Sequence, residues 1–144
     1  MENLDQVLRL WEKDSEIDQT EPGKELLKIP QLHKKYLTIL IKHRIASKDA
    51  SHEYNRMRKI KWEYYTGKFS QEQLEEYGWE QFKYTLKADL SYYMDSDLDL
   101  IKCLKTKAIH DEIIYAAESI LGELKSRTYQ LKDFIAWERF IGGN

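Results

Sequence analysis

The stretch that decides the fold is IHDEIIYAAESILGEL, residues 109–124, in which apolar residues recur every three or four positions. The recurring positions are Ile109, Ile113, Ala117, Ile120 and Leu124. Residues at this spacing lie on one face of a helix, so the stretch predicts a long helix from about Ser96 to Lys125. Its apolar stripe suits either the core of a monomer or packing between subunits, and the periodicity alone does not distinguish the two.

Helical periodicity extends over most of the remaining chain, with no strand-like alternation. We expect further helices over about 3–13, 25–46, 47–66, 70–77, 79–88 and 129–141. Pro30 is expected to kink the second of these or to mark a new helix start, and Ser47 or Ser51 to cap the third. Thr20 is an expected N-cap ahead of Pro22, and Ser70 with Gln73 forms a capping-box pattern. Only six glycines and two prolines interrupt the 144 residues. The sequence therefore predicts an all-α fold: a small multi-helix domain, 1–144, with a long C-terminal helix.

Charge is unevenly distributed along the chain. The segment 24–68 holds twelve Lys or Arg and four Asp or Glu, although the whole chain has a net charge of -2. Such segregation favours a basic face for a polyanion, or pairing of this segment with the acidic remainder. The single cysteine, Cys103, excludes an intrachain disulfide and fits a reducing cytoplasm. No long apolar run indicates a membrane span.

Signatures of catalysis are missing from the sequence. It has no phosphate-binding glycine loop, no His and Cys residues at metal-ligand spacing, and no nucleophile motif beside a base. We therefore expect neither an enzyme nor a cofactor-binding or metal-binding protein.

The most informative segment for function is RMRKIKWEYYTGK, residues 56–68, with five basic residues and three aromatic rings. Cations suit the phosphates of a single strand, and exposed rings stack on unpaired bases. A helical wheel places Lys61 and Tyr65 on one exposed stripe. The candidate single-stranded-DNA-binding residues are Arg58, Lys59, Lys61, Trp62, Tyr64, Tyr65 and Lys68. Two alternatives stay open: an RNA-binding protein, and a helical adaptor whose basic segment binds an acidic partner.

Residues 59–68, KIKWEYYTGK, resemble the motif of the UvsY family, in which a basic-x-basic pair precedes Tyr-Tyr-Ser/Thr-Gly-basic. Four further family-like motifs occur in order at 17–20, 86–89, 125–132 and 137–140. The resemblance places the family's strand-binding basic pair on Lys59 and Lys61, the second of which is typically Arg. Both the wheel and the motif choose Lys61, so we expect an exposed lysine whose replacement by alanine leaves folding nearly unchanged.

The resemblance implies a recombination mediator working in the host cytoplasm of a tailed bacteriophage. Its implied partners are single-stranded DNA, the phage single-strand-binding protein and a RecA-like recombinase of the UvsX type. It also implies a ring-like homo-oligomer. Strand binding is then expected in the basic segment, about 24–68, and oligomerisation in about 96–144.

Overall fold

A computed structural model describes residues 1–82 and 86–143, and the described residues contain helices and no strands. The helices are α1 (Leu4–Asp14), α2 (Pro22–Tyr65), α3 (Gln71–Tyr77), α4 (Leu90–Asp95) and α5 (Leu98–Ile141). This confirms the expected all-α fold with a long C-terminal helix. The chain divides into two compact units: a first unit of Met1–Ile45 with the residues from Ile109 onward, and a second unit, Ala46–Ala108.

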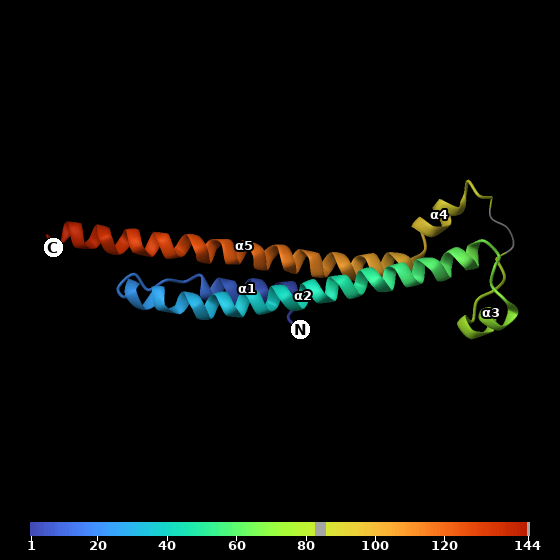
Figure 1. The fold of residues 1–144 in the computed structure, drawn as a ribbon, viewed down its shortest axis with the longest axis horizontal. Helices are drawn as coiled ribbons and strands as arrows, with labels where there is room; N and C mark the ends of the chain where they lie inside the picture. The colour runs from blue at the N-terminus through green and yellow to red at the C-terminus, as the bar shows by residue number, and fades with distance from the viewer. Residues whose placement is uncertain (83–85, 144) are drawn as a thin grey trace. The chain divides into compact units, whose positions relative to one another are not determined.

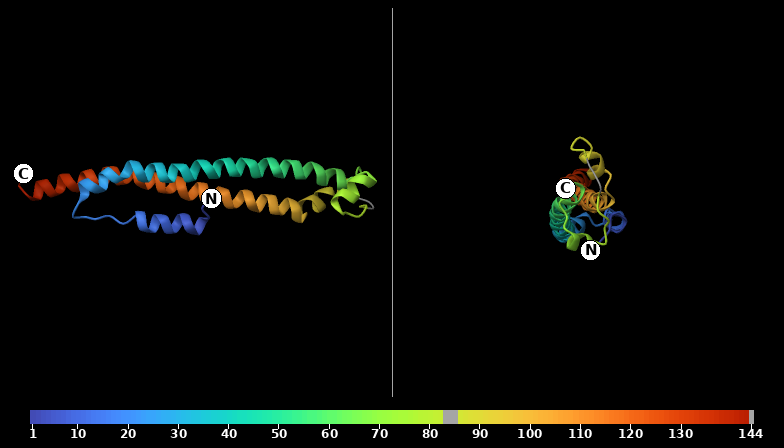
Figure 2. Two further views of the ribbon diagram at one scale, coloured as in Figure 1. Left: turned by 90° about the horizontal axis from the view of Figure 1, so that it is seen from below. Right: turned by 90° about the vertical axis from the view of Figure 1, so that its right-hand side faces the viewer.

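The first unit is built from α1 and the adjoining parts of α2 and α5, which lie alongside one another (Figures 1 and 2). Asn3 caps α1 through a capping box with Gln6, which confirms the predicted first helix. The buried core consists of Val7, Tyr36, Ile39, Leu40, Ile113, Ala117, Ile120 and Leu124. Four of the five residues of the stripe in 109–124 are therefore buried in this core, whereas the fifth, Ile109, is 58% exposed.

Helix α2 is continuous, so the expected new helix start at Ser47 or Ser51 is wrong. Pro22 is its first residue, as predicted, but the Thr20 hydroxyl donates to Asp18 rather than capping the helix. Pro30 lies inside the helix. No glycine or proline lies between Pro30 and Gly67, so nothing in the backbone forces a break near Ser47 or Ser51.

Helix α5 is also continuous, so the expected separate helix at 129–141 is wrong. The Arg127 guanidinium donates at 3.0 Å to the backbone carbonyls of Asp14 and Ser15, and Leu131 is buried. These interactions fix α5 across the region where the sequence suggested a turn. Beyond them, Trp137, Phe140 and Ile141 are exposed.

The second unit adds the two short helices. Ser70 and Gln73 form the predicted capping box of α3, and Gly67 and Gly78 adopt left-handed conformations with φ of 75° and 68°. The helix expected over 79–88 is not formed in its described residues, 79–82 and 86–88. The Trp79 ring instead packs on Phe69, a contact that holds the chain in an irregular path after Gly78.

Candidate nucleic-acid interface

The end of α2 and the turn after it carry all seven candidate residues, and the structure divides them into two groups. Arg58, Lys59, Trp62 and Lys68 are exposed, with Trp62 at 40%. Tyr64 and Tyr65 are half-buried, and Lys61 is only 6% exposed. The two groups alternate along the helix because residues three or four apart share a face.

Lys61 is a buried ion-pair residue, so the expectation of an exposed lysine is wrong. Its Nζ lies 2.7 Å from Asp99 Oδ2 and 3.2 Å from Asp97 Oδ2. The same Nζ lies 4.0 Å from the centroid of the Trp79 ring, a cation–π contact. The helical wheel of α2 could not reveal this arrangement, because the three partners come from the turn after α3 and the start of α5.

Asp97 joins the end of α2 to the start of α5. One carboxylate oxygen accepts the Asp99 and Leu100 backbone N–H groups and so caps the start of α5. The other accepts the Tyr65 hydroxyl at 2.6 Å. Burial raises the pKa of the Asp97 carboxyl. The hydrogen bonds from Tyr65, Leu100 and Lys61 outweigh that effect and hold the pKa below its usual value.

Tyr64 and Tyr65 face an aromatic cluster rather than solvent. The Tyr64 hydroxyl donates to the Glu80 carbonyl at 2.7 Å, and its ring centroid lies 5.0 Å from that of Trp79. The Tyr65 ring packs edge-on against Phe82, with centroids 5.0 Å apart. Burial and the hydrogen bond to Asp97 raise the pKa of Tyr65. Both tyrosines hold the end of α2 in place, contrary to the exposed stripe expected for Tyr65.

The outward-facing group combines exposed cations with one ring. Within the described ranges, neither Arg58 nor Lys59 has an ion-pair partner. Arg56 is different, because its guanidinium is paired with Glu53 at 2.7 Å. The Lys68 Nζ lies 4.0 Å from the Trp62 ring centroid. This surface offers positive charge and an aromatic face together.

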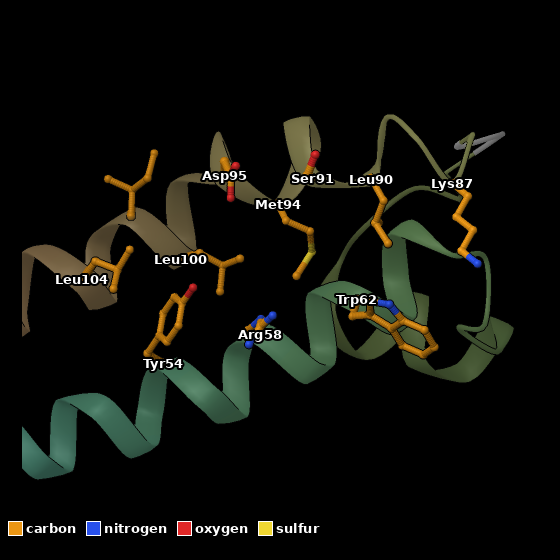
Figure 3. A pocket seen from close by; sticks show the side chains of 11 residues that line it. Tyr54, Arg58, Trp62, Lys87, Leu90, Ser91, Met94, Asp95, Leu100 and Leu104 are labelled. Atoms are coloured by element: carbon orange, nitrogen blue, oxygen red, sulfur yellow. The ribbon is translucent and has the colours of Figure 1, made fainter.

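A cavity of about 480 Å³ opens beside this surface (Figure 3). Arg58 and Trp62 line it from α2, and Lys87, Leu90 and Met94 line it from α4 and the turn before it. The basic segment alone does not indicate the second set, because these residues lie nineteen or more positions after its last residue, Lys68. The only sequence signal near them is the family-like motif at 86–89, which includes Lys87.

The part of the chain that the structure describes offers neither a metal site nor a membrane span. Among residues 1–82 and 86–143, no group of His, Cys, Asp and Glu side chains is placed to hold a metal ion. No described helix is long and apolar enough to cross a membrane.

Comparison with known proteins finds a matching family model and similar solved structures. A family model described as "Recombination, repair and ssDNA binding protein UvsY" matches residues 10–144. Two crystal structures of the bacteriophage T4 recombination mediator protein UvsY share the fold, each at 18% sequence identity. Lattice type II has a TM-score of 0.82 over 99% of both chains, and lattice type I has 0.77 over 93% of this chain and 97% of that one. No curated protein matches by sequence.

Proposed function

The chain belongs to the UvsY family of recombination, repair and single-stranded-DNA-binding proteins, and we propose that it holds the strand on the outward-facing end of α2. We propose that it acts as a recombination mediator. The observation that supports this placement is the grouping of Arg58, Lys59 and Lys68 around the exposed Trp62. Unpaired cations bind phosphates, and the ring stacks on a base without reading its identity.

The seven candidate residues then have two roles. Arg58, Lys59, Trp62 and Lys68 contact the strand. Lys61, Tyr64 and Tyr65 keep the end of α2 against Asp97 and the aromatic cluster, so that the contacting residues are held in one geometry. A preorganised surface loses less conformational entropy when it binds.

We further propose that several copies assemble through the C-terminal end of α5. Trp137 and Phe140 stack on each other at 5.8 Å and are 59% and 76% exposed, so they offer apolar surface for a second copy. A ring of weak sites would hold a strand by avidity. Such an assembly would present the strand to a RecA-like recombinase of the UvsX type in place of the single-strand-binding protein.

This activity requires binding and exchange but no catalytic group, so we propose that the chain is not an enzyme. Its working place would be the host cytoplasm, where the phage strand is exchanged between proteins. The competing functions are an adaptor for an acidic protein partner and an RNA-binding protein.

Binding to labelled oligonucleotides tests the proposal. We expect affinity for a single DNA strand that falls with salt, and weaker binding to duplex DNA. In a reaction with strand precoated by single-strand-binding protein, the chain should restore ATP hydrolysis by the recombinase. Failure to bind any DNA would favour the adaptor, and tighter binding to an RNA of the same sequence would favour the RNA-binding function.

A further inference from the structure

We propose that the cavity beside Trp62 receives one nucleobase drawn out of the stack of the bound strand. The inference rests on the proposed strand binding and adds a site to it. The cavity belongs entirely to the second unit and measures about 480 Å³, within the usual range of small-molecule sites. A base with its sugar fits a space of this size.

Trp62 supplies the stacking surface. Its ring lines the cavity and has the Lys68 ammonium 4.0 Å from its centroid. The lysine occupies one face of the indole, which leaves the other face for a base. An aromatic ring accepts any base, because every base has a π face.

The opposite wall presents apolar side chains between its polar ones. Leu90 and Met94 point from α4 toward Arg58 and Trp62 on α2, and Leu100 closes the inner side (Figure 3). A flat base placed between these side chains and the indole would be shielded from water on both faces. The flexible thioether of methionine adapts to bases of different size.

Two cations flank the same space. Arg58 and Lys87 line the cavity from its two walls, and they are placed to meet the phosphates on either side of an inserted nucleotide. Asp95 also lines the cavity and offers an acceptor to an N–H group on the edge of a base.

A base held in this way would interrupt the stacking of its neighbours. The bound strand would be bent and partly unstacked at one position for each copy of the protein. Flipping is least costly for a base that is already unpaired, which would also favour single strands over duplex DNA.

The test compares an oligonucleotide of about fifteen thymidines, a length within the usual range of single-strand sites, with the same backbone carrying abasic residues. Stacking of one base is worth about 5- to 150-fold in affinity, so the wild-type chain should bind the abasic strand more weakly by that factor. Trp62→Ala should bring the ratio of the two affinities close to one. Tyr92→Ala is the matched control, because Tyr92 is an exposed ring on α4 that does not line the cavity.

Each outcome separates this inference from the proposed function. Equal and firm binding of both strands by the wild-type chain overturns the base site and leaves strand binding intact. A thymidine preference that survives in Trp62→Ala also overturns it, because the base then stacks elsewhere. Binding of neither strand contradicts the proposed function itself. The ratio of the affinities for the thymidine and abasic strands is measured on the wild-type chain alone. The proposal can therefore be tested even if Trp62→Ala does not fold.

Discussion

Replacing Lys61 by alanine should destabilise the second unit, because it leaves a buried carboxylate without its cation. Removing one partner of a buried ion pair costs about 3–5 kcal/mol. Asp97 would still accept the Tyr65 hydroxyl and two backbone N–H groups, and Asp99 is half exposed, so we expect the lower end of that range. Removal of the cation–π interaction with Trp79 adds about 0.5–2 kcal/mol.

Thermal unfolding followed by circular dichroism measures this destabilisation. A decrease of about 3 kcal/mol lowers Tm by about 6–12 °C in a chain of this size. Lys61→Met keeps most of the aliphatic side chain and removes the charge, so it should lower Tm slightly less than Lys61→Ala does. Lys59→Ala is the matched control, because it removes an exposed lysine two positions away and should leave Tm nearly unchanged.

A double-mutant cycle with Asp97→Asn tests the physical reason. The two single variants, Lys61→Met and Asp97→Asn, should not be additive, since each breaks the same pair, and a coupling of about 0.5–3 kcal/mol is expected. The reasoning is refuted if Lys61→Met unfolds at the wild-type temperature, or if the double variant is destabilised by the full sum of the two single effects.

Three further perturbations follow from the structure. Changing Trp137 and Phe140 together to serine should lower the molecular mass measured by sedimentation and leave the helical content intact, because both rings are exposed. Burial and then the neighbouring His110 lower the pKa of His43 below its ordinary value of 6.5, so the folded chain keeps this ring neutral while the unfolded chain protonates it. Stability should therefore fall as pH drops from about 7 to 5, and His43→Gln, unlike the exposed-site control His52→Gln, should flatten the dependence of the urea midpoint on pH. Ser70→Ala removes the capping box of α3 and should cost about 1 kcal/mol, seen as faster amide exchange in that helix.

Local features of the sequence were sufficient to predict the helical fold and several helix ends. The apolar stripe in 109–124 and the Ser70 capping box each depend on residues close together in the chain. The continuity of α2 and α5 was not predictable in this way. Arg127 stabilises α5 through carbonyls more than a hundred positions away, and only tertiary packing shows that its helix continues.

The candidate site was predictable to a similar extent. The basic, aromatic segment at 56–68 contains Arg58 and Trp62, two exposed residues that line the cavity. The helical wheel gave the wrong exposure for Lys61, because a wheel considers one helix alone and contains no residue from other parts of the chain. In the structure, Lys61 is buried because it pairs with Asp97 at the start of α5. Lys87 and Met94 likewise join the site only through the tertiary fold.

The salt dependence of single-strand binding tests the central claim most directly, namely that the outward-facing cations contact the strand and Lys61 does not. The slope of log affinity against log salt changes by about 0.7 for each phosphate of a single strand that the protein no longer neutralises. A variant with Arg58, Lys59 and Lys68 all changed to alanine should therefore reduce the magnitude of the slope by about 2 on a short oligonucleotide that engages one copy. Lys61→Met, measured at a temperature where it is folded, should keep the wild-type slope. A reduced slope in Lys61→Met together with a wild-type slope in the triple variant would contradict the account.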